Sequence, residues 1–214
     1  MKYKTIIFDL DGTLLNTLTD LHSSVNYAMR SCAFPERSMD EVRRFVGNGV
    51  HTLIRRAAPE GITVEQYWAA YDAFEEHYAK HNHDYTAPYD GIPQLMRELK
   101  KRGHKLAIVS NKIDFAVQAL KREFFDDTVD CAVGDSEEIE NKPAPDMVYK
   151  AMKELGAELD ECVYIGDTDV DLATAENSGM PCISVSWGFR SREELEGYAA
   201  AIIADTPSDI LGLV

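Results

Sequence analysis

The sequence predicts an α/β fold, a doubly wound and mainly parallel sheet with an inserted small α-helical domain. Two observations support this prediction. Short apolar runs rich in β-branched and aromatic residues alternate with amphipathic stretches over most of the chain, as strands and crossover helices do. Between residues 16 and 82, in contrast, nearly every stretch has the pattern of a helix. We therefore expect a discontinuous α/β core domain of residues 1–15 and 85–214, and an α-helical domain of residues 16–84.

The first predicted strand ends in an acidic pair. In the stretch Thr5–Leu15, TIIFDLDGTLL, a short apolar run precedes Asp9 and Asp11, and Gly12 follows as a turn residue. Two carboxylates at the end of a buried strand repel each other and lose solvation unless a cation lies between them. The stretch therefore indicates a cation site. The alternative is that one aspartate caps the next helix and the other is exposed.

The inserted segment is too long for a loop and is expected to have its own core. Thr17 or Thr19 is expected to cap a first helix that continues to about Arg30, and Ser38 begins a predicted capping box. A long helix is predicted over residues 63–80. It carries five aromatic residues, which we interpret as core of this small domain: Tyr67, Trp68, Tyr71, Phe74 and Tyr78.

The alternation of strands and helices returns after the insertion. Strands are predicted at residues 105–110, 129–133, 162–166, 182–185 and 201–204. Helices are predicted at residues 91–102, 114–124, 146–155 and 169–177, and three of them end at Gly103, Gly156 and Gly179. Because each helix can return the chain to the start of the next strand, this order predicts parallel pairing.

The charge balance excludes some classes of partner. The chain has 22 Lys and Arg against 37 Asp and Glu, a formal net charge of −15, so we expect neither nucleic acid nor a membrane as partner. The four cysteines form no closely spaced pair, and buried thiols are expected at Cys131, Cys162 and Cys182, which lie in or beside apolar runs. We expect no signal peptide and no membrane span, and a cytoplasmic location. A monomer and a homodimer are both compatible with the sequence, which has no evident heptad seam.

Polar residues follow several of the predicted strands. In a doubly wound sheet, ligands bind outside the carboxyl ends of the strands. The residues expected at that edge are Asp9, Asp11, Thr13, Ser110, Asn111, Lys112, Asp167, Asp169 and Asp171, with Lys142 before a helix. Carboxylates suit Mg²⁺, which often binds a substrate phosphate as well, and a lysine and a hydroxyl can hold phosphate oxygens. The residue types therefore predict phosphoryl chemistry.

Four motifs resemble those of the haloacid dehalogenase (HAD) superfamily, in the expected order. They are DLDGT at residues 9–13, Ser110, Lys142 and GDTDVD at residues 166–171. The helical insertion after the first motif is similar to the small cap of the phosphoglycolate phosphatase-like branch. Three further stretches are similar to that branch: FVGNGV at residues 45–50, SNK at 110–112 and VSWGFR at 185–190. The resemblance implies a Rossmann-like core, a helical cap and phosphatase activity.

The resemblance also implies catalytic roles. Asp9 is the expected nucleophile, which forms an aspartyl-phosphate, and its ordinary pKa of about 3.9 would keep it ionised. Asp11 is the expected general acid for the leaving group, and then the base that activates water. The expected cofactor is Mg²⁺, held by Asp9, the backbone carbonyl of Asp11, and Asp167. Asp171 is expected to assist directly or through water.

The remaining implied roles concern the substrate. Phosphate binding is expected at Thr13, Ser110, Asn111 and Lys142, and substrate contacts from the cap at Gly47, Asn48 and Gly49. Two alternatives stay open: Ser110 as a helix N-cap, and Lys142 as a surface lysine. Asn16 stands where the family usually has Asp, which could alter the charge of the hinge into the cap.

The expected partner is a small phosphorylated metabolite, with 2-phosphoglycolate as the favoured substrate. A phosphatase of another small metabolite, or a pyrophosphatase of the same fold, is the alternative. From a different class, a non-enzymatic phospho-receiver or binding module also combines a strand-end aspartate, an acidic pair and a lysine. Such a module has no use for the helical insertion or for a proton-transfer group at Asp11.

Overall fold

The computed structural model describes residues 2–214, which form two compact units. The larger unit contains the chain up to Leu15 together with Pro88–Val214, and the smaller unit contains Asn16–Ala87. The chain passes between them at two short strands, β2 (Leu15–Asn16) and β3 (Ala87–Pro88), which form a two-stranded sheet. The side chain of Asn16 accepts a hydrogen bond from the backbone N–H of Leu18 at the start of the first helix (3.4 Å).

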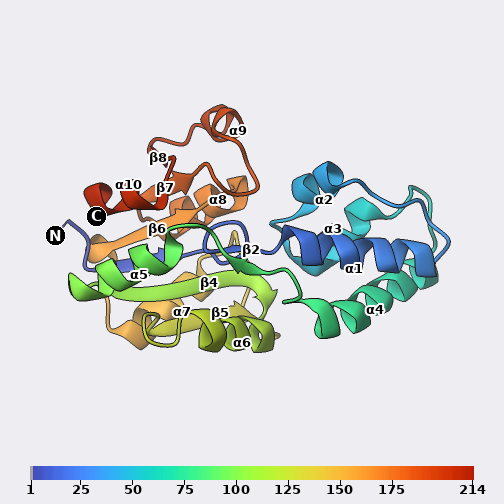
Figure 1. Ribbon diagram of the computed structural model, residues 1–214, viewed down its shortest axis with the longest axis horizontal. Helices are drawn as coiled ribbons and strands as arrows, with labels where there is room; N and C mark the ends of the chain where they lie inside the picture. The colour runs from blue at the N-terminus through green and yellow to red at the C-terminus, as the bar shows by residue number, and fades with distance from the viewer. Residues whose placement is uncertain (1) are drawn as a thin grey trace. The chain divides into compact units, whose positions relative to one another are not determined.

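The larger unit is built on one six-stranded sheet, in which all the pairs of neighbouring strands are parallel (Figure 1). The strand order is β5-β4-β1-β6-β7-β8. The strands are β1 (Thr5–Phe8), β4 (Lys105–Ile113), β5 (Cys131–Asp135), β6 (Cys162–Gly166), β7 (Cys182–Val185) and β8 (Ile203–Ala204). The predicted α/β fold with a mainly parallel sheet is confirmed.

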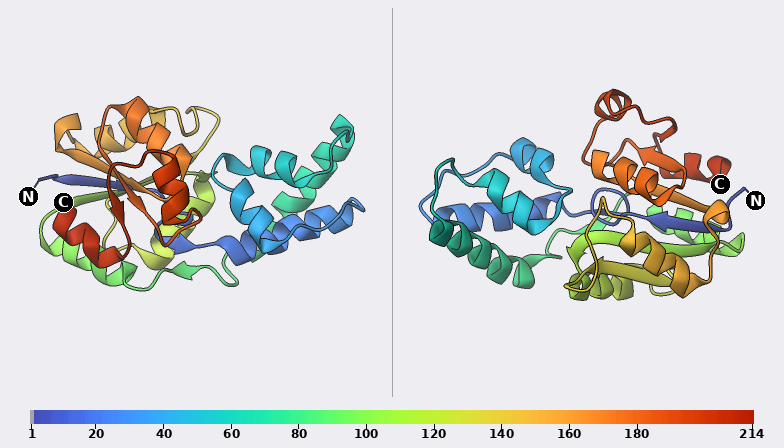
Figure 2. Two further views of the ribbon diagram at one scale, coloured as in Figure 1. Left: turned by 90° about the horizontal axis from the view of Figure 1, so that it is seen from above. Right: turned by 180° about the vertical axis from the view of Figure 1, so that it is seen from behind.

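Both faces of this sheet are covered, because successive side chains of a strand point to opposite faces. Ile6 and Phe8 of β1 pack with residues of α5 (Ile92–Lys101), α6 (Asp114–Phe124) and α10 (Pro207–Leu213). Ile7 of β1 packs on the other face with residues of α7 (Asp146–Leu155) and α8 (Asp169–Ser178). Figure 2 shows the same unit from above and from behind. The central strands are therefore apolar on both faces, as the sequence predicts for β1.

Some short elements differ from the predicted ones. β5 begins and ends two residues later than predicted, and a 3₁₀ turn at Leu159–Glu161 precedes β6. Two C-terminal helices, α9 (Arg192–Gly197) and α10, are absent from the prediction. Both have local start signals that a reading of apolar period overlooks: a capping box at Ser191, and a capping box at Thr206 followed by a proline.

The smaller unit consists of four helices: α1 (Leu18–Ser31), α2 (Met39–Phe45), α3 (Gly49–Ala57) and α4 (Val64–His81). The capping box predicted at Ser38 is present, and Thr63 forms another with Gln66. Buried apolar side chains from the helices make its core, including Val25, Ile54 and Phe74. These residues explain why the segment is a folded unit and not a long loop.

The interpretation of the aromatic series as core is wrong for Trp68, which is exposed, whereas Phe74 and Tyr78 are buried and Tyr67 and Tyr71 are half-buried. Ala70, Phe74 and Tyr78 are buried and follow one another at intervals of four residues on one side of α4. Tyr67, Trp68 and Tyr71 fall outside this stripe, and Trp68 is 46% exposed. They lie around the imidazole of His51, which stacks on Tyr71 at 4.4 Å between ring centroids.

Within the part of the chain that the structure describes, no helix has the length and apolar character needed to cross a membrane.

Candidate active site

The candidate site lies at the carboxyl ends of three neighbouring strands. Phe8, the last residue of β1, is in register with Ile108 of β4 and Ile165 of β6. Asp9 and Asp167 directly follow β1 and β6, and Ser110 lies in the last part of β4, so the three residues lie on adjacent strands at one edge of the sheet. From β1 the chain first builds outward through β4 and β5, and then returns to the other side of β1 with β6. This reversal of strand order is where doubly wound sheets bind ligands.

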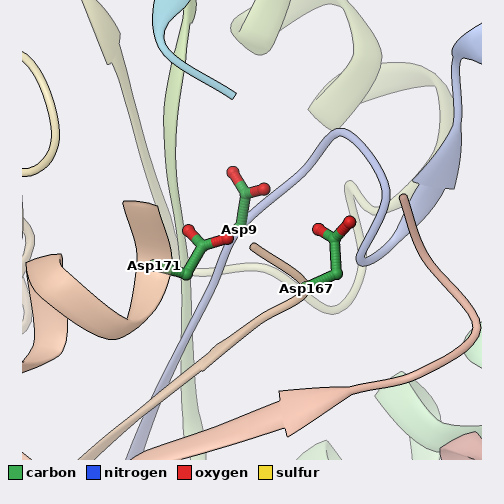
Figure 3. Close-up of side chains that lie close together, drawn as sticks. All are labelled: Asp9, Asp167 and Asp171. Carbon is green, nitrogen blue, oxygen red and sulfur yellow. The ribbon is translucent and has the colours of Figure 1, made fainter. Parts of the chain in front are cut away.

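Three buried carboxylates converge at this edge (Figure 3). Asp9 follows β1, Asp167 follows β6, and Asp171 lies in the first turn of α8. One oxygen of each lies within 4.8 Å of one oxygen of each of the others. The three residues are between 0% and 6% exposed. The sequence-predicted metal ligands Asp9, Asp167 and Asp171 are thus brought together.

Glycines make the room for these carboxylates. A Cβ atom on Gly12 would lie 2.4 Å from Oδ2 of Asp167, and a Cβ atom on Gly188 would lie 2.5 Å from the same oxygen. A Cβ atom on Gly166 would lie 2.3 Å from Cγ of Asp171. Such distances are too short for real side chains, so only glycine fits at these positions. The acidic cluster is therefore packed directly against backbone.

Lys142 supplies the positive charge inside this cluster. Its Nζ donates to Oδ1 of Asp9 and to Oδ1 of Asp171, both at 2.8 Å, and lies 3.1 Å from the hydroxyl of Tyr164. The residue is 5% exposed, so the alternative of a surface lysine is wrong. Burial lowers the pKa of the Lys142 ammonium, but the carboxylates of Asp171 and Asp9 outweigh burial and hold this pKa well above its usual value.

The side chain of Asn111 holds the backbone of Lys142. Its Nδ2 donates to the carbonyl of Lys142 at 2.9 Å, and its Oδ1 accepts from the N–H of Lys142 at 2.8 Å. These two hydrogen bonds fix the loop that carries the lysine to the end of β4. The binding of phosphate by Asn111 stays a prediction. The amide side chain is engaged in positioning Lys142.

Asp167 is held by two donors from different loops. The hydroxyl of Thr13 donates to Oδ1 at 2.9 Å, and the backbone N–H of Phe189 donates to Oδ2 at 2.6 Å. Thr13, a predicted phosphate-binding residue, is 0% exposed and directs its hydroxyl to this carboxylate. Burial raises the pKa of Asp167 from 3.8 to about 7, and repulsion from Asp171 adds to the shift.

The carboxylate of Asp11 points to the end of β4. Its Oδ1 accepts from Nζ of Lys112 at 2.8 Å, and its Oδ2 lies 3.4 Å from Oγ of Ser110. The next helix, α6, begins at Asp114 with Ile113 as its N-cap, so the alternative of Ser110 as a helix N-cap is wrong. Ser110 lies beside Asp11 at the end of β4, and its binding of phosphate stays a prediction.

The donor set of the cluster fits Mg²⁺. Two ligands of one Mg²⁺ ion can be at most about 4.2 Å apart, twice the bond length, and the three carboxylates approach this spacing. Burial raises the pKa of Asp9 well above its ordinary value; Lys142 opposes this shift, while Asp171 and Asp167 add to it. The expectation that an ordinary pKa keeps Asp9 ionised is therefore wrong for the metal-free site. A divalent cation beside Asp9 favours the ionised form.

The expected substrate contacts of the cap belong to the smaller unit. Gly47 and Asn48 precede α3, and Gly49 is its first residue. Gly47 and Gly49 have φ angles of 125° and 75°, which favour glycine. Their role toward a substrate stays a prediction.

Sequence reasoning assigned no role to two residues of the site. Lys112 contacts Asp11, and Tyr164 contacts both Lys142 and Asp171. The SNK stretch signals Lys112 only as a polar residue at a strand end. Tyr164 has no such signal, because an aromatic residue inside a strand is ordinarily core.

Known proteins resemble this chain over almost its whole length. A "Phosphoglycolate phosphatase" of Aquifex aeolicus is 30% identical, over 99% of this chain and 96% of the relative. A "Pyrophosphatase PpaX" of Bacillus mycoides is 29% identical, over 100% of this chain and 98% of the relative. The crystal structure of a candidate phosphoglycolate phosphatase from Lactobacillus delbrueckii subsp. bulgaricus superposes with a TM-score of 0.94 at 38% identity, over 98% and 97% of the two chains.

The family match agrees with the arrangement of the site. Residues 6–185, which include the four sequence motifs and all three carboxylates of the cluster, match the haloacid dehalogenase-like hydrolase family. This match covers well over half of the sequence, and the chain therefore belongs to the haloacid dehalogenase-like hydrolases.

Proposed function

We propose that this phosphatase requires Mg²⁺ and hydrolyses small phosphomonoesters through an aspartyl-phosphate, with 2-phosphoglycolate as its favoured substrate. One observation carries the proposal: the buried carboxylates of Asp9, Asp167 and Asp171 converge around the ammonium of Lys142 at the switch point of the sheet. Buried acids of this density need cations, and a phosphate ester brings negative charge to the same place.

Asp9 is the proposed nucleophile. A carboxylate oxygen of Asp9 bonds to phosphorus while the bond between phosphorus and the leaving oxygen breaks. The leaving oxygen takes a proton from Asp11 and departs as an alcohol. In the second step a water molecule attacks the same phosphorus and gives a proton to Asp11. Inorganic phosphate leaves, and both aspartates return to their starting states.

The other residues bind and orient the phosphoryl group. Lys142 offsets the repulsion between Asp9 and the substrate, and Ser110 donates to a phosphoryl oxygen. Thr13 and Asn111 act one step further away, since their side chains hold Asp167 and the backbone of Lys142. Asp9, Asp167, Asp171 and the backbone carbonyl of Asp11 would hold Mg²⁺, which supplies charge stabilisation for the phosphoryl oxygens when bound.

Two substrates are candidates, 2-phosphoglycolate and pyrophosphate. Both candidate substrates come from the names of relatives, phosphoglycolate phosphatase and pyrophosphatase PpaX, at similar identity. A pyrophosphatase is therefore the second candidate. A non-enzymatic receiver is disfavoured, because the relatives that align over nearly the whole chain are named as enzymes.

A panel of phosphate compounds tests the substrate proposal. We expect 2-phosphoglycolate to have the highest kcat/KM among small phosphomonoesters, and a higher value than pyrophosphate. The measurement is inorganic phosphate release at several concentrations of each compound, with the two phosphates per pyrophosphate taken into account. A higher kcat/KM for pyrophosphate than for every monoester would replace the first candidate by the second.

Removal of divalent ions tests the cofactor. We expect EDTA to abolish p-nitrophenyl phosphate turnover, and excess Mg²⁺ to restore it. Since Mg²⁺ binds the folded cluster, it should also stabilise the fold, by about 2.7 kcal/mol at a concentration 100 times its Kd. Turnover that persists in EDTA at the rate found with Mg²⁺ would contradict the proposal.

The stability of the metal-free protein should depend on pH. The folded-state pKa of Asp167 is raised from 3.8 to about 7, so without metal this carboxyl binds more protons in the folded state than in the unfolded state. Its contribution to stability is present below about pH 4 and is lost as the pH rises toward 7. Thermal unfolding in EDTA should therefore occur at a lower temperature near neutral pH. Mg²⁺, which competes with protons for the carboxylates, should stabilise the protein more there than in acid.

A further inference from the structure

A buried ion pair joins Asp11 to Lys112 at the end of β4. The distance between Nζ of Lys112 and Oδ1 of Asp11 is 2.8 Å, and the two side chains are 5% and 13% exposed. Placing a lysine out of solvent is costly unless its charge is matched. By comparison, the pair Lys100–Asp130 is 30% and 35% exposed. The Lys112 pair is therefore different from an ordinary surface pair, which contributes little.

The course of β4 explains how Lys112 reaches Asp11. The pairing of β4 with β5 is irregular between Val109 and Ile113, and the residues in between are buried. Side chains of a strand alternate in direction. Ser110 and Lys112 both contact Asp11, whereas Asn111 binds the backbone of Lys142. The end of one strand thus serves both the proton-transfer residue and the phosphate-binding lysine.

The two oxygens of Asp11 differ in how firmly they are held. Oδ1 accepts a charge-assisted hydrogen bond of 2.8 Å from Lys112, which is short and strong. Oδ2 lies 3.4 Å from Oγ of Ser110, a long contact. The same Oγ accepts the backbone N–H of Lys112 at 3.2 Å, which keeps the serine beside the pair. Oδ1 is thus anchored, and Oδ2 is the oxygen left for exchange with a reacting group.

We propose that Lys112 is a positioning residue for the reaction: it anchors Oδ1 of Asp11 so that Oδ2 transfers the proton. This inference rests on the proposed function, in which Asp11 protonates the leaving group. As Asp9 bonds to phosphorus and the leaving oxygen departs, that oxygen takes its proton from Oδ2 of Asp11, while Lys112 keeps all of its protons. A general acid must lie within hydrogen-bond reach of its target, and an error of 1 Å can cost about 10²-fold in rate.

Leaving-group dependence tests this role. p-Nitrophenyl phosphate releases a phenolate that is stable without a proton, whereas phenyl phosphate, of nearly the same shape, depends more on protonation. We expect Lys112→Met to lower kcat/KM for phenyl phosphate by about 10²-fold, and that for p-nitrophenyl phosphate much less. kcat/KM is the right quantity because it covers the steps up to release of the phenol and excludes hydrolysis of the aspartyl-phosphate. The ratio of kcat/KM for phenyl phosphate to kcat/KM for p-nitrophenyl phosphate should therefore fall in Lys112→Met. Lys112→Arg should restore part of this ratio.

Two further variants make the result decisive. Lys100→Met, which breaks the exposed pair with Asp130, should leave the ratio between the two substrates unchanged. Asp11→Asn should lower the ratio as Lys112→Met does, and adding Lys112→Met to Asp11→Asn should lower it no further. The ratio is measured on one preparation, so it is independent of the folded fraction.

The possible failures are distinct. If Lys112→Met lowers kcat/KM equally for both substrates while Asp11→Asn is selective, Lys112 does not act through Asp11 and the inference is overturned alone. If Asp11→Asn is not selective either, the proposed proton-transfer role of Asp11 is wrong, and the inference on Lys112 is overturned with it.

Discussion

Asp9→Asn is expected to reduce turnover by about 10⁶-fold, the order of loss found when an enzyme loses its nucleophile. An amide oxygen is a far weaker nucleophile than a carboxylate, and the structure offers no substitute in the same place. Asp167, in the turn after β6, and Asp171, in α8, are both held by hydrogen-bond donors of their own. Phosphate release from p-nitrophenyl phosphate in excess Mg²⁺ measures the effect.

The fold should tolerate this substitution. The amide oxygen of Asn can still accept the hydrogen bond from Lys142 that Oδ1 of Asp9 accepts at 2.8 Å. The substitution also removes one carboxylate from the cluster, where burial raises the pKa of Asp9 well above its usual range. We therefore expect the thermal stability of the metal-free protein to be unchanged or higher. A variant that is inactive because it is unfolded would not meet this expectation.

Asp169→Asn is the matched control for Asp9→Asn. In the sequence Asp169 lies between Asp167 and Asp171 of the cluster. Its side chain, however, is 42% exposed, and its Oδ1 lies 3.5 Å from Nη2 of Arg190. The same chemical change there should leave turnover close to that of the wild type. In addition, the wild-type intermediate should carry its phosphoryl group on the peptide that contains Asp9. Near-full turnover of Asp9→Asn, or a phosphoryl group on another peptide, would show that the nucleophile is a different residue.

The fold could be predicted from the sequence because its main signals are local. The β1 residues Ile6, Ile7 and Phe8 are apolar whichever face they meet, and the helices that cover them have clear period and glycine ends. The edge at which Asp9 and Asp167 meet then follows from parallel pairing. The prediction failed for Trp68 in the aromatic series of α4, which is exposed. Hydrophobicity alone does not show which aromatic residue of a helix lies off the buried stripe.

The contacts inside the site could not be predicted in the same way. Ser110, Lys142 and the acids were found because their residue types at strand ends signal chemistry. Asn111, in contrast, holds the backbone of a residue 31 positions away, and Lys112 pairs with Asp11 across 101 positions. Such contacts depend on the irregular end of β4 and on the path of the loop before α7. Neither has a local sequence pattern.

Lys142→Met is expected to lower both activity and stability. The variant loses the donor to Asp9 and Asp171 and the positive charge that a phosphoryl group would meet, so we expect kcat/KM to fall by about 10²- to 10³-fold. Breaking a buried pair by removing one partner costs about 3–5 kcal/mol, because the other charge stays buried without compensation. Denaturant unfolding in EDTA measures the free energy of unfolding.

Lys150→Met provides the control for Lys142→Met. Lys150 is exposed on α7 in the same unit, and the same substitution there should change neither activity nor stability appreciably. Arginine is not a conservative replacement at position 142, because its planar guanidinium presents its donors in a different geometry from a compact ammonium. Loss of activity in both the Met and Arg variants is therefore expected.

The stability loss of Lys142→Met has a specific cause that can be separated from a packing defect. If the loss arises from repulsion between buried carboxylates, removing one of them by adding Asp171→Asn should recover part of the free energy of unfolding. Saturating Mg²⁺ should also recover part of it, because the ion compensates the same charges. A packing defect would respond to neither. A metal-free Lys142→Met variant as stable as the wild type at neutral pH would mean that the ammonium does not compensate the acids, and that Lys142 is present for the phosphoryl group alone.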